Sequence, residues 1–380
     1  MTVRETDSDR RRVSCVGLST TACWDESANL RGELLTVEAL VEHAREVALA
    51  HGQPSMSVAA APLRSRFAVA RASLRQAYDR LHAAAAESKH VPAPAEEWLL
   101  DNAHVVSDQL REIEEDLPSG YLAKLPRLAS GEMAGYPRVY ALCLDYLRHT
   151  DARIELDGLV RYVDAYEDVS VLTIGELWAV PIMLRIGLVL SVMARAAVDD
   201  AEEARVRADR WSARLQEAGA SSALKAFAEE PATPAFLVEL MRRLREHDAP
   251  VGLEWVRARC AALGTTPDEL ARQYHLRQAA DQVSVGNAIT SMRCIAAFSW
   301  NEFFERVSVV ERTLREDPGG AYALTDGPTR DRCRHAVEDI ARGSSASEYE
   351  VAKSALELAR TASAEQPSDC LLYTSPSPRD

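Results

Sequence analysis

Signals for the start of an α-helix recur along this chain of 380 residues. In a capping box, a Ser or Thr hydroxyl accepts a hydrogen bond from the third amide of the helix, and a Glu three residues later accepts from the amide of the capping residue. Capping boxes or a Thr-Pro start occur at Thr173/Glu176, Thr233/Pro234, Thr266/Glu269, Ser299/Glu302 and Ser347/Glu350. Alternating β-branched runs between hairpin turns are missing from the sequence. We therefore predict an all-α fold, a multi-helix array or bundle of short capped helices.

Apolar residues at helical spacing place these helices along the chain. The clearest seam predicts one helix through 99–117, and its members recur at alternating spacings of 4 and 3 residues: Leu99, Ala103, Val106, Leu110, Ile113 and Leu117. Further helices are expected at about 37–51, 62–87, 138–149, 155–167, 174–198, 200–218 and 234–247. Pro181 inside the 174–198 pattern predicts a kink or a break.

Composition excludes several classes of function. The net charge is −14, from 44 basic and 58 acidic residues, which disfavours nucleic acid as a partner. The seven cysteines are odd in number and form no C-x-x-C pair, so a disulfide framework or a zinc knuckle is not expected. Reduced thiols in a cytoplasmic setting fit this pattern.

The expected organisation is one helical region between two tails. Residues 1–23 are expected to form a flexible tail without a secretory signal, because the polar start lacks an apolar h-region. Residues 24–368 would form the helical domain, which could divide into lobes at 24–200 and 201–368. The apolar stretch 169–198 contains Glu176, Arg185 and Arg195, so we expect a buried core helix rather than a membrane span. Residues 369–380 change character abruptly and are expected to be non-native or disordered, with the natural gene continuing beyond 369.

An irregular loop is expected at about 118–138, where Pro and Gly recur. Tyr121, Tyr136 and Arg138 lie in it and could dock a sugar or a partner, or anchor the loop to the helices. Glu176 has a structural role available as the carboxylate of a capping box.

A predicted core helix near 278–293 carries unusual polar residues. Gln282, Asn287 and Thr290 lie among apolar neighbours, and Gly286-Asn287 would weaken a helix there. These side chains could meet a substrate or another domain, or they could form an internally satisfied network or a helix junction.

Motifs for familiar chemistry are missing from the sequence. There is no Walker loop, no dinucleotide-binding glycine pattern, no H-E-x-x-H and no G-x-S-x-G. The nine histidines show no metal-ligand spacing, so we assign no metal, cofactor or catalytic residue. A pair of catalytic carboxylates, as in glycosidases, cannot be identified among 58 acidic residues.

Several segments, taken in order, resemble the N-terminal region of bacterial cyclic β-1,2-glucan synthases. The most specific are WLLDN at 98–102 and LTIGELWAVPIMLR at 172–185, which includes Trp178. The others are RGELLTVE at 31–38 with HA at 43–44, and the segments 111–113, 116–118, 125–129, 135–140, 149–151, 283–287, 289–291, 303–305 and 329–332.

The resemblance implies a large inner-membrane enzyme that uses UDP-glucose and a divalent metal. This chain would be its helical region on the cytoplasmic face, a scaffold or regulator without a membrane span. The partner would be the downstream transferase domain of the same polypeptide, or glucan. The only D-x-D, at 7–9, lies in the expected tail, so no catalytic residue can be assigned. Two alternatives remain open: a self-contained, carboxylate-dependent β-glucan transglycosylase or hydrolase, and a helical adaptor that binds other proteins.

Overall fold

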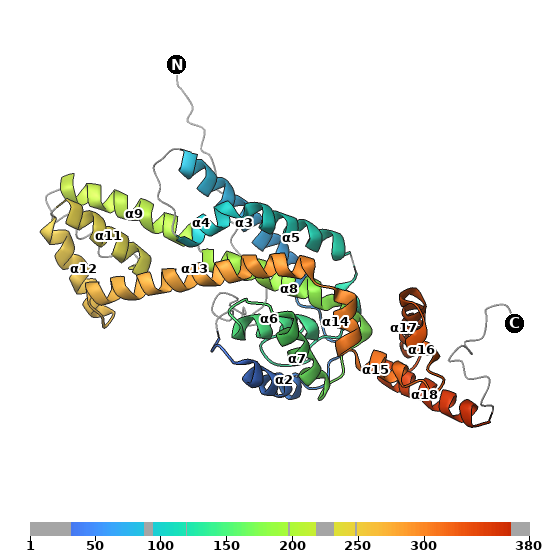
Figure 1. Ribbon diagram of the computed structural model, residues 1–380. Helices are drawn as coiled ribbons and strands as arrows, with labels where there is room; N and C mark the ends of the chain where they lie inside the picture. Colours follow the sequence, from blue (N-terminus) through green and yellow to red (C-terminus); the bar gives the residue numbers. More distant parts are fainter. Residues whose placement is uncertain are drawn as a thin grey trace, which may run out of the picture.

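The computed structural model describes residues 32–86, 94–118, 120–196, 198–217, 232–247 and 249–365. The tails expected at 1–23 and 369–380 lie outside these ranges. Within these ranges the regular elements are helices (Figure 1). Arg127 also forms two isolated β-bridges, one with Ser55 and one with Pro137. The predicted all-α fold is therefore confirmed.

The helices fall into two groups along the chain. The first group comprises α2 (Val37–His51), α3 (Leu63–Ala86), α4 (Pro94–Asp101), α5 (Ala103–Asp116), α6 (Arg138–His149), α7 (Leu156–Glu167) and α8 (Ile174–Ala196). The second comprises α9 (Val198–Glu217), α11 (Pro234–Glu246), α12 (Pro250–Ala262), α13 (Pro267–Ala297), α14 (Trp300–Val307), α15 (Val309–Arg315), α16 (Ala321–Leu324), α17 (Gly327–Arg342) and α18 (Glu348–Glu365). The segment 118–137 is irregular apart from a 3-10 turn, Leu122–Lys124, as predicted.

The predicted caps are formed. At six helix starts the hydroxyl oxygen of the capping Ser or Thr accepts a hydrogen bond from the backbone amide three residues later. These helices are α2, α8, α11, α13, α14 and α18. At α8 and α18 the box is complete, because the carboxylates of Glu176 and Glu350 accept the amides of Thr173 and Ser347 at 2.9 Å and 2.7 Å. Local sequence therefore defines these helix starts.

One prediction about helix continuity was wrong. The single helix expected through 99–117 is interrupted at Asn102, whose side-chain amide donates to the Trp98 carbonyl at 2.8 Å, beside its own backbone amide at 3.2 Å. Of the kink or break expected at Pro181, the break is not formed, because α8 continues to Ala196 inside a shell of other helices; the kink stays a prediction.

The helix α8 lies at the centre of the larger apolar core. It contacts α3, α4, α5, α6, α13 and α14, and the long helix α13 runs from α12 to α14 and packs against it (Figure 1). By length and composition, 174–195 is the one described stretch that could cross a membrane, with a mean hydropathy of 2.0. In this structure 78% of its apolar window is buried among helices, as a core helix would be.

A second apolar cluster forms at one end of α13. It contains Trp211 of α9, Phe236 and Leu240 of α11, Val256 of α12 and Leu270 of α13. The larger cluster includes residues from α2 through α8 and again from α13 through α18. The division into lobes at residue 200 stays a prediction.

Candidate functional site

A buried ion pair joins α6 to the first turn of α8. The Arg138 side chain donates from Nε to Oε1 of Glu176 at 2.9 Å and from Nη2 to Oε2 at 2.5 Å. Arg138 is 2% exposed and Glu176 is fully buried. A paired, bidentate geometry of this kind is what allows two charges to lie in an apolar interior.

The same pair fixes the connection between α7 and α8. Arg138 also donates to the Ser170 hydroxyl at 2.8 Å and to the Val171 carbonyl at 3.1 Å. The Glu176 carboxylate additionally caps its own helix through Thr173. Both carboxylate oxygens of Glu176 and all three guanidinium nitrogens of Arg138 thus have a structural partner, which supports the structural role expected for Glu176.

Two further carboxylates, buried Glu167 and half-buried Glu348, accept backbone amides near neighbouring helix starts. Glu167 is 2% exposed and accepts the amides of Leu172 at 3.0 Å and Val309 at 3.1 Å. Glu348 accepts the amide of Ile174 at 2.6 Å. Burial raises the pKa of Glu167 to about 8 and that of Glu348 to about 7. Raised pKa values of this kind occur in general acids, but these two carboxyl groups are engaged by backbone amides.

The aromatic residues of the 118–138 loop point inward. Tyr136 is buried and stacks on Tyr140 with ring centroids 5.6 Å apart, and Arg66 donates to its hydroxyl. Tyr121 is half-buried, and its hydroxyl donates to the Gly175 carbonyl at 3.4 Å. Both therefore anchor the loop, while a role in docking stays a prediction.

Trp178 connects α8 to α14. Its ring stacks on Phe304 with centroids 4.9 Å apart and planes 11° from parallel. The guanidinium carbon of Arg334, on α17, lies 4.9 Å from the centroid of the Phe304 ring. These two contacts connect α8 to α14 and α14 to α17.

The polar face of α13 meets the turn after α6. Asn287 donates to the Asp151 carboxylate at 3.1 Å and to its carbonyl at 3.2 Å, and Ser284 donates to the same carboxylate at 2.5 Å. Asp151 has a φ of 50°, a left-handed conformation that Asp tolerates better than most residues. The network is internal, and α13 continues through Gly286-Asn287 without a junction.

Thr290 and Gln282, the other two polar residues singled out on α13, are not among the partners of Asp151. Thr290 is exposed and donates to the carbonyl of Gly286 in its own helix at 2.8 Å. Gln282 is half-buried, one turn before Gly286. Their expected docking role stays a prediction.

Another buried network, which was not predicted from the sequence, connects α15, α16 and α17 through Glu311. Glu311 is fully buried and accepts from Arg315 at 2.8 Å, Arg334 at 3.1 Å and the Tyr322 hydroxyl at 2.6 Å. The spacing of Glu311 and Arg315, four residues apart on a helix, was the available signal. Its other partners, Tyr322 on α16 and Arg334 on α17, come from later segments, so the sequence around Glu311 does not indicate them.

Histidines from two helices gather around Asp145, where the sequence analysis saw no ligand spacing. His43 of α2 and His149 of α6 lie with one ring nitrogen each near this carboxylate, all within 4.8 Å of one another. The Asp145 carboxylate raises the pKa of His43. Burial would raise the pKa of Asp145, but the nearby His43 imidazole and the hydrogen bond from the Tyr162 hydroxyl hold this pKa below its ordinary value.

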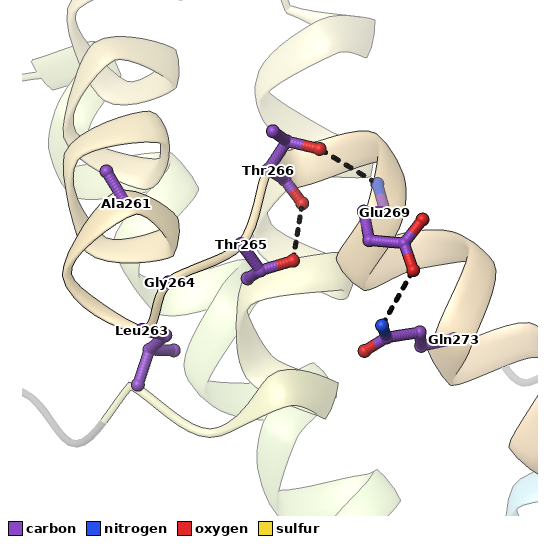
Figure 2. A pocket seen from close by; sticks show the side chains of 7 residues that line it. All are labelled: Ala261, Leu263, Gly264, Thr265, Thr266, Glu269 and Gln273. Atoms are coloured by element: carbon purple, nitrogen blue, oxygen red, sulfur yellow. Dashed lines mark hydrogen bonds between the residues drawn. The ribbon is translucent and has the colours of Figure 1, made fainter.

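A hollow of about 510 Å³ opens between α12 and α13 (Figure 2). It is lined by Ala261, Leu263, Gly264, Thr265, Thr266, Glu269 and Gln273. The one carboxylate among these, Glu269, accepts from Gln273 at 2.7 Å and from Arg272 at 2.8 Å. Glycoside cleavage by acid and base needs a pair of carboxylates, which this hollow does not supply.

Comparison with known proteins gives one strong similarity. The chain is 32% identical over 293 residues to the cyclic beta-(1,2)-glucan synthase NdvB of Rhizobium meliloti (strain 1021). The match covers 75% of this chain and 10% of that protein, so the chain spans about a tenth of the length of this relative. No family profile matches the chain. The resemblance inferred from the sequence is confirmed by this similarity.

Proposed function

We propose that this chain, which is similar to a tenth of a cyclic β-(1,2)-glucan synthase, is a helical scaffold module of such an enzyme. The module holds or regulates a membrane glucosyltransferase that builds cyclic β-1,2-glucan from UDP-glucose. It does not itself carry out the transfer.

One observation carries this proposal: the segments of the resemblance pack against one another. The segment 172–185 forms the first half of α8, which contacts α4 and α13. The Trp98 ring lies 3.6 Å from the position that a Cβ on Gly286 would occupy. Arg293 donates to Asn102 at 2.6 Å and ties α13 to the end of α4. These segments thus contribute to one helical framework.

The charges of this core support the same proposal. A sugar-nucleotide site must hold a diphosphate, usually through cations, a metal or helix-terminal amides. Arg138 is engaged with Glu176, and Arg185 lies 2.9 Å from a Glu112 oxygen. These two arginines neutralise carboxylates of the protein and so are not positioned to hold a diphosphate. The net charge of the chain, −14, also opposes the binding of an anion.

Cofactor, partner and location follow from the proposed role. UDP-glucose and the divalent metal of the transfer would both bind elsewhere in the parent enzyme. Its partner would be the transferase domain of the same polypeptide. The module would lie at the cytoplasmic face of the bacterial inner membrane.

Incubation of the purified chain with labelled UDP-glucose and Mg²⁺ or Mn²⁺ tests the proposal. We expect neither hydrolysis nor transfer of glucose above the protein-free control. Turnover that is lost on mutation of residues within 32–365 would place the catalytic centre in this chain. A parallel incubation with linear β-1,2-glucan tests the self-contained hydrolase, and new reducing ends or cyclic products would favour it over the scaffold.

A further inference from the structure

Three side chains with metal-binding atoms meet where α2 lies against α6. His43 comes from α2, and Asp145 and His149 lie four residues apart on one face of α6. One donor atom from each residue lies within 4.8 Å of the others. The three side chains are 25%, 20% and 13% exposed, so an ion and a water molecule could reach them.

The distances approach those of a metal centre. Nε2 of His43 lies 3.0 Å from Oδ2 of Asp145, and Nε2 of His149 lies 3.7 Å from Oδ1. Donors bound to one tetrahedral zinc ion, at bond lengths of about 2.0–2.1 Å, lie roughly 3.3 Å apart. Small side-chain rotations would therefore bring the three atoms to a common ion.

The surroundings orient these donors as the outer shell of a metal site does. Nδ1 of His149 lies 2.7 Å from the Glu33 carbonyl, and donation to that oxygen leaves Nε2 with a free lone pair toward Asp145. The Tyr162 hydroxyl donates to the Asp145 carboxylate at 2.7 Å. Metal-ligating histidines and carboxylates usually have such second partners.

The Nε2 atom of His43 is buried and faces the site. It lies 3.0 Å from Oδ2 of Asp145, an ion-pair contact that lacks the alignment of a good hydrogen bond. A buried polar atom in such a contact gains from a better-aligned partner. The edge-to-face arrangement of the two imidazoles, with centroids 4.5 Å apart, leaves both ring edges near the carboxylate.

We propose that His43, Asp145 and His149 form a binding site for one divalent transition-metal ion of the zinc class. Two imidazoles and one carboxylate favour such an ion over Mg²⁺ or Ca²⁺, which prefer oxygen ligands. The bound ion would fasten α2 and the segment at Glu33 to α6, with water in the fourth position. The sequence suggested no metal because the ligands come from two helices, so only the fold reveals the group.

Titration calorimetry of the untagged, metal-free chain with ZnCl₂ tests the site. We expect one ion per chain and no saturable binding of Mg²⁺. Replacement of either ligand, in His43→Gln or His149→Gln, should weaken binding by at least ~10-fold. The matched control is His335→Gln on α17, because His335 has the same four-residue spacing to Asp331, 3.6 Å away, without a second imidazole. This control should bind zinc as the unaltered chain does.

A second measurement needs no variant and so does not depend on how the variants fold. Zinc should protect His43 and His149, but not His335, from modification by diethylpyrocarbonate, as read by peptide mass spectrometry. Stoichiometric binding with this protection supports the site. Failure to bind one ion saturably, equal binding by the ligand variants and the unaltered chain, or equal protection of His335 would overturn it.

Discussion

Replacing Glu176 by Gln removes the negative partner of a fully buried ion pair and keeps the size of the side chain. The Arg138 guanidinium, 2% exposed, would keep its bonds to Ser170 and Val171 but lose two charge-assisted bonds to the carboxylate. The amide nitrogen of Gln would face either Arg138 or the Thr173 amide, and both are donors. The capping box of α8 is therefore weakened at the same time.

The magnitude follows from these two losses. Leaving one charge of a buried pair without its partner typically costs about 3–5 kcal/mol. Loss of a capping interaction costs about 0.5–2 kcal/mol, although the two effects share one carboxylate and do not add fully. We expect Glu176→Gln to lower the free energy of unfolding by about 3–5 kcal/mol.

Urea unfolding followed by circular dichroism measures this change. The control is Asp339→Asn, which breaks a pair with Arg342 in which both side chains are mostly exposed, at 73% and 69%. That pair is screened by water, so its loss should leave the midpoint unchanged within error. A shift below about 1 kcal/mol for Glu176→Gln would refute the structural reasoning. Loss of an enzymatic activity without loss of stability would refute it more strongly.

The remaining predictions concern the loop, the α13 network and a buried acid. Gly135→Ala should lower the free energy of unfolding by about 2–4 kcal/mol, as measured in urea, because φ is +85° and the new Cβ would lie 2.7 Å from the Ala59 carbonyl oxygen. The control is Gly131→Ala, with a φ of +84° and open space around it, which should lower the free energy of unfolding by only about 1–2 kcal/mol. Asp151→Ala should cost at least about 2 kcal/mol, since it removes charge-assisted bonds to α13, and the shift should be smaller for Asp151→Asn. For Glu167, the folded pKa of about 8 exceeds the ordinary 4.5, so its contribution to stability is complete below pH 4.5 and is lost as pH rises through 8. Unfolding free energies across pH 5–8 should therefore fall less steeply in Glu167→Gln, and an unchanged slope would contradict the raised pKa.

Much of the helical architecture could be predicted because its signals are local. A hydroxyl and a Glu three residues apart satisfy amides of the same turn, so Thr173 and Ser347 mark real helix starts whatever surrounds them. The interruption at Asn102 could not be seen in this way. Its amide competes with the backbone while its oxygen accepts from Arg293, nearly two hundred residues later in the chain.

The polar networks were harder to predict because their partners are distant in sequence. Glu176 was correctly expected to cap a helix, yet nothing in its own segment indicated Arg138 as its main partner. Two members of the group around Asp145 could have been paired from the sequence, since His149 follows Asp145 by four residues on one helix. The third member, His43, is brought there by the packing of α2, which depends on the whole core.

Initial rates of glucose incorporation into cyclic β-1,2-glucan test the central proposal most directly. Membranes would carry the Rhizobium meliloti synthase in three forms: unaltered, with its matching segment replaced by this chain, and with that segment deleted. A scaffold module predicts comparable synthesis by the first two forms, and loss of synthesis on deletion at equal amounts of membrane-inserted protein. Full synthesis by the deleted form would contradict the account, because the transferase would then need no helical module of this kind.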